Sequence, residues 1–163
     1  MKKAQNAPKK IINIAYGSNM DLEQMALRCP EAEIVGKGII RDYRLLFKGS
    51  KTGSYATIER APGFTVPVVL WAVSEGDIRN LDRYEGFPTF YYKKDIEVEL
   101  TRILPGTPKK VKAMAYIMDE NRLLGVPSEY YTQLLATAYR RFGFDFDILF
   151  DGLEFSEANA GRP

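Results

Sequence analysis

The chain has 163 residues and a formal net charge of +2, and 45% of its residues are hydrophobic and 27% charged. This composition is that of an ordinary globular domain, large enough to bury about two-thirds of its unfolded surface in one core. Four lysines near the start more than account for the net charge, so the remainder is slightly acidic and a nucleic-acid partner is not expected. These lysines are Lys2, Lys3, Lys9 and Lys10.

Histidine is absent from the sequence, and Cys29 is the only cysteine. Without histidine there is no Ser-His or Cys-His nucleophile pair and no zinc site of the usual histidine-containing kinds. Carboxylates, tyrosines or lysines would have to move the protons of any catalysed reaction. One cysteine cannot form an internal disulfide and fits a reducing cytoplasm, and no apolar run approaches the roughly 20 residues that span a bilayer. We therefore expect a cytoplasmic protein with no membrane partner and no secretory signal.

The first patterned segment runs from Ile11 to Met20 and changes character at YGSN, residues Tyr16 to Asn19. A short apolar, β-rich run precedes this turn, and good helix formers follow it from Asp21 onward. Glycine permits a sharp turn or a close approach to a ligand, and the free N–H groups of a helix start attract anions. The turn is therefore either an anion-binding site or a plain helix start that Ser18 caps, with Asp21 completing a capping box and no ligand.

The middle of the chain is rich in β-forming residues. A long segment from Glu33 to Lys48 predicts one strongly curved strand or two strands, and a further strand follows at Tyr55 to Ile58. The turn-forming residues from Ala61 to Gly63 are predicted to end that strand. Val66 to Val73 is almost unbroken in its apolar character, which is typical of a central strand buried on both faces.

A helix is predicted to begin after Ser74 and to end at Gly86. Ile78 and Leu81 lie on its apolar face, and Glu85 falls on the same face at the helix end. Burial and the negative end of the helix dipole both disfavour the charged carboxylate, so the pKa of Glu85 is expected to rise. A carboxylate with a raised pKa suits a general base at neutral pH. The alternative is that a glutamate at a helix end simply turns toward solvent.

The last third of the chain predicts a hairpin and one more helix. Phe90 to Leu100 and Val111 to Met118 are the two predicted strands of the hairpin. The helix opens at Ser128 and stops at Gly143. Past Asp151 the pattern is lost, and we expect the chain to fray there.

The order of these elements predicts a single α+β domain with a mixed, curved or barrel-like β-sheet and a few flanking helices. Residues 1–10 are assigned to a flexible basic tail and residues 11–150 to the folded domain. Residues 151–163 are assigned to a C-terminal tail.

Four short motifs occur in order along the chain: YGSN at Tyr16 to Asn19, VVLWAVS at Val68 to Ser74, LDRYEG at Leu81 to Gly86, and GVPSEYY at Gly125 to Tyr131. With these motifs the chain resembles the gamma-glutamylcyclotransferase-like family over residues 11–143. YGSN alone is a weak signal, whereas YGSN followed by an LDxxEG element is quite specific. A short C-terminal part and few polar insertions set the chain apart from the best-studied eukaryotic members, which leaves the substrate open more than the class.

The resemblance implies a small barrel-like α+β fold in which Glu85 is the catalytic residue and the YGSN turn holds the glutamyl end of a substrate through backbone groups. The substrate-binding residues that it implies are Tyr16, Gly17, Ser18, Asn19, Met20, Tyr92 and Tyr131. Because each of these last two tyrosines has a tyrosine neighbour, Tyr91 and Tyr130 remain alternatives. Core packing with the hydroxyl at the surface is a further alternative for these side chains.

The reaction that the resemblance implies is an intramolecular aminolysis of a small γ-glutamyl substrate. The Glu85 carboxylate takes a proton from the α-ammonium group, the amine attacks the γ-carbonyl, and Glu85 returns the proton to the departing amine. The products are 5-oxoproline and an amine or amino acid, with no metal or cofactor, from a monomer or homodimer. The alternatives are a γ-glutamyl amine or a γ-glutamyl-protected biosynthetic intermediate as substrate, or a non-catalytic module that binds small acidic metabolites.

Overall fold

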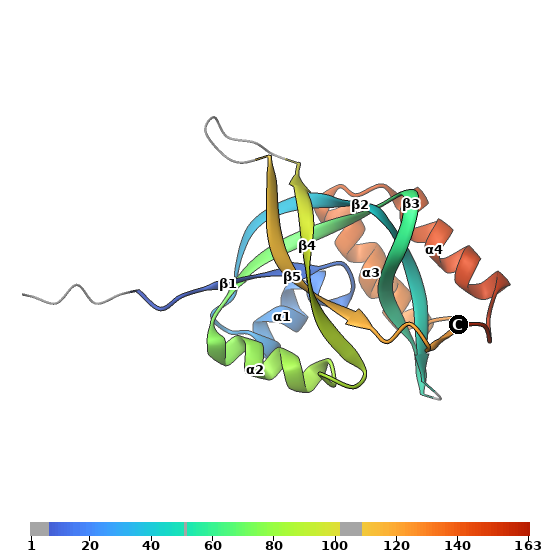
Figure 1. The fold of residues 1–163 in the computed structure, drawn as a ribbon, viewed down its shortest axis with the longest axis horizontal. Helices are drawn as coiled ribbons and strands as arrows, with labels where there is room; N and C mark the ends of the chain where they lie inside the picture. The colour runs from blue at the N-terminus through green and yellow to red at the C-terminus, as the bar shows by residue number, and fades with distance from the viewer. Residues whose placement is uncertain (1–6, 51, 102–108) are drawn as a thin grey trace, which may run out of the picture.

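Five strands close into a mixed β-barrel in the computed structural model, which describes residues 7–50, 52–101 and 109–163 (Figure 1). Their order around the barrel is β3-β1-β5-β4-β2, and β2 pairs back with β3. β1 runs parallel to β5, and the other pairings are antiparallel. The strands are β1 (Ile11–Ala15), β2 (Glu33–Ser50), β3 (Gly53–Val73), β4 (Tyr91–Leu100) and β5 (Lys110–Met118), with the short β6 (Leu123–Leu124) paired to β2. The predicted α+β domain with a barrel-like sheet is confirmed.

Four α-helices and one short 3₁₀ helix accompany the barrel in the described residues. They are α1 (Leu22–Arg28), α2 (Glu75–Tyr84), α3 (Glu129–Phe142) and α4 (Phe146–Ala158), together with the 3₁₀ helix η1 (Ser18–Met20). In Figure 1, α1 and α2 lie toward the side from which β1 enters the barrel, and α3 and α4 lie toward the side where the chain ends. None of the helices in the described part is both long enough and apolar enough to cross a membrane.

Capping groups set the boundaries of α2 and α3. Ser74 Oγ accepts the N–H of Asp77 at 3.0 Å, and Asp77 Oδ2 accepts the N–H of Ser74 at 3.1 Å, which makes a capping box. Ser128 Oγ accepts the N–H of Tyr131 at the start of α3. Gly143 ends α3 with a φ of 70°, in the left-handed region that favours glycine. The two helices predicted after Ser74 and Ser128 are confirmed.

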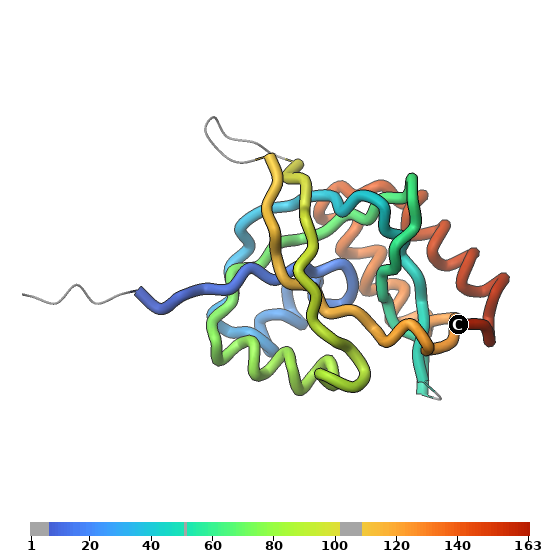
Figure 2. The backbone as a smooth tube through the Cα atoms, in the orientation of Figure 1, coloured from blue at the N-terminus to red at the C-terminus, as the bar shows by residue number. Residues whose placement is uncertain are grey.

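β2 and β3 form one long hairpin, whose two backbones run side by side in Figure 2. The predicted end of a strand at Ala61 to Gly63 is wrong, because β3 continues through it. The pairing does lapse there: Arg41 pairs with Thr65 and Tyr43 with Arg60, so one residue of β2 lies opposite four of β3. That residue, Asp42, has a φ of 62° and accepts the N–H of Gly63 through Oδ1 at 3.0 Å. The turn-like residues therefore make a bulge within a strand.

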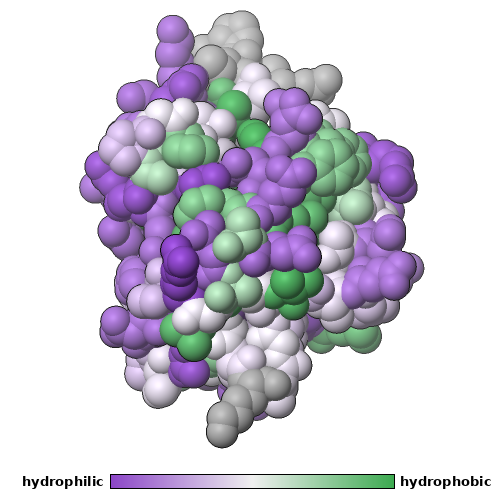
Figure 3. All heavy atoms as spheres, turned by 90° about the vertical axis from the view of Figure 1, so that its right-hand side faces the viewer, coloured by the Kyte–Doolittle hydropathy of each residue, from purple (hydrophilic) through white to green (hydrophobic). Residues whose placement is uncertain are grey.

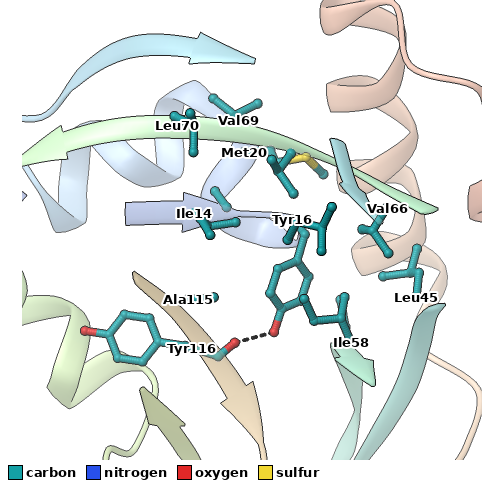
Figure 4. Packing of buried hydrophobic residues seen from close by; sticks show 14 of the residues in the cluster. Ile14, Tyr16, Met20, Leu45, Ile58, Val66, Val69, Leu70, Ala115 and Tyr116 are labelled. Atoms are coloured by element: carbon teal, nitrogen blue, oxygen red, sulfur yellow. Dashed lines mark hydrogen bonds between the residues drawn. The ribbon is translucent and has the colours of Figure 1, made fainter. Parts of the chain in front are cut away.

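The second half of β3 lies in the centre of the fold, as predicted for Val66 to Val73. It pairs with β1 on one side and with β2 on the other, and its apolar residues are no more than 6% exposed. Figure 4 shows side chains from several strands meeting in this core, among them Ile14 of β1, Leu45 of β2 and Ala115 of β5. This core supports the end of β1, from which the YGSN turn departs.

The C-terminal part is helical, so the prediction of a frayed tail past Asp151 is wrong. α4 packs on β2: Arg44 forms a two-pronged ion pair with Asp151, with N–O distances of 3.0 and 2.9 Å. Ser156 is buried and its Oγ accepts the N–H of Phe47 at 2.9 Å. The folded domain therefore extends through α4. At the other end, residues 7–10 contain no helix or strand, and residues 1–6 of the predicted basic tail lie outside the described residues.

The face of the molecule on the α4 side carries mostly hydrophilic side chains, with hydrophobic ones in small separate groups (Figure 3). Phe150 of α4 is 52% exposed, whereas Leu149 is 1% exposed. α4 thus turns one face toward the barrel and the other toward solvent, as an amphipathic helix does on a globular domain.

Gly152 tests the close packing of α4 on β2. A Cβ atom added there would lie 2.8 Å from the backbone oxygen of Leu45. We expect Gly152→Ala to lower the free energy of unfolding by about 1–3 kcal/mol, because overpacking outweighs the better helix propensity of alanine. Urea denaturation measures this change.

Gly76 of α2 offers the matched control, since a Cβ atom there meets nothing closer than 3.7 Å. Gly76→Ala should leave stability unchanged or raise it slightly. A Gly152→Ala protein as stable as the wild type would contradict the close contact between α4 and β2.

Candidate active site

A small cavity of about 30 Å³ lies where the YGSN turn meets the C-terminal end of α2. Its lining comes from β1, the turn, β3, the end of α2, β4, β5 and α3, and comprises Ile14, Ala15, Tyr16, Gly17, Ser18, Asn19, Ala56, Glu85, Tyr91, Tyr116 and Tyr131. An adjoining cleft of about 250 Å³ shares four of these residues: Ser18, Glu85, Tyr91 and Tyr131. The predicted catalytic glutamate and the predicted binding turn therefore face the same space.

The turn itself differs from the predicted helix start. Residues Ser18–Met20 form η1, and it is Asp21 that caps α1, by accepting the N–H of Gln24 at 2.9 Å. The hypothesis that Ser18 caps the helix is wrong: Ser18 Oγ instead accepts a hydrogen bond from Arg28 at 3.2 Å. The turn is thus a separate element between β1 and α1, and its residues are available to line the cavity.

Met20, predicted as a substrate-binding residue, belongs to the core. Its side chain is fully buried in the core (Figure 4), and its N–H donates to the carbonyl oxygen of Gly17 at 3.0 Å. Because that N–H closes the 3₁₀ turn, it is not free for a ligand. Of the predicted binding residues in this segment, Tyr16 to Asn19 line the cavity and Met20 does not.

Glu85 caps the C-terminal end of α2, as its position in the sequence predicted. Its N–H donates to the carbonyl oxygen of Leu81 at 2.8 Å, and Gly86 follows with a φ of 62°. Glu85 Oε1 accepts a hydrogen bond from Asn19 Nδ2 at 2.9 Å. Burial raises the pKa of the Glu85 carboxyl to about 7, although the hydrogen bond from Asn19 and the charge of Arg28 lower it. Glu85 therefore exchanges a proton near neutral pH, as a general base requires.

Asn19 links the turn to both the core and the carboxylate. Its backbone oxygen accepts the indole N–H of Trp71 in β3 at 2.9 Å, and its side-chain amide donates to Glu85. Trp71 is 5% exposed, so this indole donor is a fixed part of the core. The hydrogen bond with Trp71 fixes the turn to β3, and the hydrogen bond with Glu85 joins it to the end of α2.

Three tyrosines complete the wall, of which Tyr16 and Tyr91 are buried and Tyr131 is partly buried. Tyr16 donates its hydroxyl to the backbone oxygen of Tyr116 (Figure 4), and Tyr91 donates to the backbone oxygen of Ala56 at 2.9 Å. The Tyr131 hydroxyl accepts the N–H of Ala56 at 3.0 Å. Burial raises the pKa of Tyr16, Tyr91 and Tyr131, so these hydroxyls stay protonated near pH 7.

One member of each tyrosine pair lines the cavity. Tyr131 lines the cavity, as predicted, while Tyr130 is 72% exposed. Tyr91 also lines it, whereas the predicted Tyr92 points to another surface groove and donates its hydroxyl to Glu120. Tyr92 lies away from this cavity because successive residues of a strand face opposite sides of the sheet. Sequence reasoning also missed Tyr116, which no local motif marks, and the role of Trp71, which lies in the VVLWAVS motif but was not assigned to the site.

Gly17 brings the turn close to the opposite wall. A Cβ atom at this position would lie 3.1 Å from the hydroxyl oxygen of Tyr131 and 3.2 Å from the Cβ of Ala56. Glycine therefore allows the backbone of the turn to lie close to Tyr131 and Ala56.

Comparison with known proteins fits this geometry. A family model described as "Gamma-glutamyl cyclotransferase, AIG2-like" matches residues 14–133, which contain the turn, Glu85 and Tyr131. The chain belongs to this family. A protein from Homo sapiens named gamma-glutamylcyclotransferase is 27% identical over 146 residues, covering 85% of the chain and 75% of that protein. A protein of the same name from Mus musculus is 28% identical over 136 residues, covering 79% of the chain and 70% of that protein.

Solved structures share the family's fold. A structure titled gamma-glutamyl cyclotransferase has a TM-score of 0.75 at 24% identity, covering 95% of this chain and 89% of that chain. The structure of YkqA from Bacillus subtilis has a TM-score of 0.73 at 18% identity, covering 95% of this chain and 56% of that one. At these identities the likeness shows the fold alone.

The raised pKa of Glu85 predicts a pH-dependent cost in stability. Burial raises the pKa from 4.5 to about 7, so the folded protein holds this proton more tightly than the unfolded chain. Ionisation then lowers stability as the pH rises from about 4.5 to 7, by up to about 3 kcal/mol. We expect Glu85→Gln to be about 1–3 kcal/mol more stable than wild type at pH 8 and to show no gain at pH 4.5. Denaturant unfolding at both pH values measures the difference.

Glu157, which is exposed on α4, provides the control. Glu157→Gln should change stability little at either pH. An equal effect of Glu85→Gln at both pH values would show that Glu85 ionises at its ordinary pKa in the folded protein.

Proposed function

We propose that this protein is an enzyme that cyclises the γ-glutamyl group of a small substrate to 5-oxoproline and releases an amine or amino acid. The observation that carries the proposal is the position of Glu85, whose carboxyl has a pKa of about 7, accepts a hydrogen bond from Asn19 of the YGSN turn and lines the same cavity as that turn. Membership in the gamma-glutamyl cyclotransferase family and the names of the curated relatives support the same reaction.

The zwitterionic end of a glutamyl group suits the space that the cavity and the adjoining cleft of about 250 Å³ form together beside Glu85 and the YGSN turn. The α-ammonium group faces the Glu85 carboxylate, and the α-carboxylate faces backbone N–H groups of Gly17 to Asn19. The hydroxyl of Tyr131 accepts the N–H of Ala56, and its own hydrogen is directed to the substrate. A buried carboxylate beside an anion site would repel a plain anion, whereas an amino acid group compensates both charges.

Glu85 moves one proton during the proposed reaction. As a carboxylate it takes a proton from the α-ammonium group, and the free amine then attacks the γ-carbonyl carbon to form the C–N bond of the lactam. The C–N bond to the leaving group breaks as protonated Glu85 gives its proton to the departing nitrogen. The second proton that the lactam nitrogen still carries after the attack passes to the freed amine, which leaves as an ammonium ion. Because nucleophile and electrophile belong to one molecule, the main task of the protein is to hold the substrate folded for attack.

The adjoining cleft is where we place the leaving group. Tyr55, Tyr84 and Phe90 line this cleft but not the inner cavity, so they would contact the part of the substrate beyond the γ-carbonyl. Aromatic side chains offer apolar faces to many small groups. The proposal therefore includes γ-glutamyl amines and γ-glutamyl-protected intermediates as well as dipeptides.

Glu85→Gln tests the proposed base. A panel of γ-glutamyl dipeptides and γ-glutamyl amines should yield 5-oxoproline with the wild-type protein, and Glu85→Gln should lower kcat at least 10³-fold while circular dichroism shows a folded protein. Tyr92→Phe is the control, because Tyr92 lies outside the cavity, and it should keep near wild-type turnover. Substantial turnover by Glu85→Gln would remove Glu85 from the role of base. Binding of these compounds without turnover by the wild type would favour a non-catalytic binding module.

Gly17→Ala tests the substrate-orienting role of the turn. The added Cβ presses on Tyr131 and Ala56, so the turn must move away from the substrate position. We expect kcat/KM to fall about 10- to 100-fold, because a displacement of about 1 Å disturbs the reactive geometry. Gly36→Ala is the matched control, since its Cβ meets nothing closer than 4.0 Å. Unchanged kcat/KM in Gly17→Ala would argue against the turn as the orienting element.

A further inference from the structure

Arg28, the last residue of α1, does not line the cavity but contacts the turn that does. Its Nη1 donates to Asn19 Oδ1 at 2.6 Å and to Ser18 Oγ at 3.2 Å. Its Nη2 donates to Gln24 Oε1. The guanidinium is therefore held in one orientation by three neighbours on the turn and on α1.

Arg28 also contacts the helix that carries Glu85. Its guanidinium carbon lies 3.4 Å from the centre of the Tyr84 ring, and Tyr84 immediately precedes Glu85. The backbone oxygen of Arg28 accepts a hydrogen bond from Asn80 Nδ2 at 3.1 Å. Through these contacts one residue joins the turn to the last turns of α2.

The contact with Asn19 determines which way its amide points. A guanidinium can only donate hydrogen bonds, so the Asn19 atom that it meets must be the carbonyl oxygen. The amide nitrogen then faces Glu85, to which it donates at 2.9 Å. With the amide reversed, its oxygen would face the Glu85 carboxyl and favour the protonated acid, which cannot act as a base.

We propose that Arg28 is a positioning residue that fixes the orientation of the Asn19 amide and thereby keeps Glu85 able to accept the proton of the substrate ammonium group. The proposal rests on the proposed function, in which Glu85 is the base. Arg28 acts through Asn19 and touches no reacting atom.

The other titratable groups near Glu85 do not supply this effect. They are Tyr16 after β1, Tyr84 of α2, Tyr91 of β4, Tyr116 of β5 and Tyr131 of α3. Burial keeps the pKa of Tyr16, Tyr91, Tyr116 and Tyr131 high, so these side chains are neutral near pH 7. Asp82 accepts a hydrogen bond from Tyr116 and pairs with Lys93 at 2.9 Å. Arg28 is the cation whose charge lowers the pKa of Glu85.

The test compares pH profiles of kcat/KM for 5-oxoproline formation. The wild-type profile should rise with an inflection near pH 7, the pKa of Glu85. Arg28→Gln removes the charge of Arg28 and the hydrogen bond that orients the Asn19 amide, both of which favour the Glu85 carboxylate. The inflection of its profile should therefore move up by about one pH unit. Activity at pH 7 should then fall several-fold and recover partly at pH 9. Arg28→Lys keeps the positive charge but not the branched guanidinium group, so its shift of the inflection should be smaller.

Three further measurements separate positioning from a general loss of structure. Arg79→Gln removes an exposed arginine of α2 and should leave the profile unchanged. Asn19→Ala should shift the inflection upward as Arg28→Gln does, and the double variant should add little to Asn19→Ala alone. This cycle also serves if Arg28→Gln fails to fold, because Arg28→Lys can replace it.

Two outcomes would overturn the inference. An Arg28→Gln profile that is lower at every pH but has the wild-type inflection would show a structural role only. Fully additive shifts in the double variant would show that Arg28 does not act through Asn19.

The Glu85 carboxyl can also be titrated by ¹³C NMR with ¹³C-labelled glutamate, assigned with Glu85→Gln, and this readout needs no turnover. Upward shifts in Arg28→Gln and Asn19→Ala that do not add in the double variant would support the positioning role even if no compound is cyclised. The absence of 5-oxoproline would then count against the proposed function alone.

Discussion

The hydrogen bond between Asn19 and Glu85 joins two segments 66 residues apart in the sequence, and the candidate site depends on it. One partner stands in a turn after β1 and the other at the end of α2, so neither element forms the site alone. The bond also meets a chemical constraint: burial raises the free energy of the carboxylate, and a donor to that carboxylate lowers it again. The balance leaves the pKa of Glu85 near 7, so the carboxyl can gain or lose a proton near neutral pH at small free-energy cost.

The barrel holds these two segments in place. β1 lies between β3 and β5, and α2 begins directly after β3. The register in which Ala15 pairs with Val69 therefore relates the start of the turn to the strand that leads into α2. Trp71 of that same strand donates to the Asn19 backbone. A closed sheet with one interior core is stiff, so the distance between the turn and the helix end is largely a property of the barrel.

Local patterns were enough to find the parts of the site that are continuous in sequence. The YGSN turn, the helix after Ser74 and the place of Glu85 at its end all follow from glycine positions, capping residues and helical spacing. The resemblance implies Tyr92, whereas Tyr91 lines the cavity. Side chains alternate along a strand, and the sequence does not show which set faces inward. Arg28 had no signal at all, since its contacts with Asn19 and Tyr84 depend on how α1 meets α2.

The errors in the fold have similar physical causes. Past Asp151, the contacts of α4 with β2 include those of Gly152 and Ser156, and such small residues do not mark a buried helix face in the sequence. The bulge in β3 needs Asp42 of the neighbouring strand to accept a hydrogen bond from Gly63. Such features belong to pairs of elements, and a single segment cannot disclose them.

Ala56 connects the β2–β3 hairpin to the candidate site through its backbone. Its N–H donates to the Tyr131 hydroxyl of α3, and its carbonyl oxygen accepts the Tyr91 hydroxyl of β4, so a single residue of β3 holds both tyrosines. Ala56 is also the residue that pairs with Phe47 of β2. The positions of both hydroxyls therefore depend on the register of the β2–β3 hairpin. A slip of that hairpin by one residue would break both hydrogen bonds to the tyrosines while leaving the amount of β-structure the same.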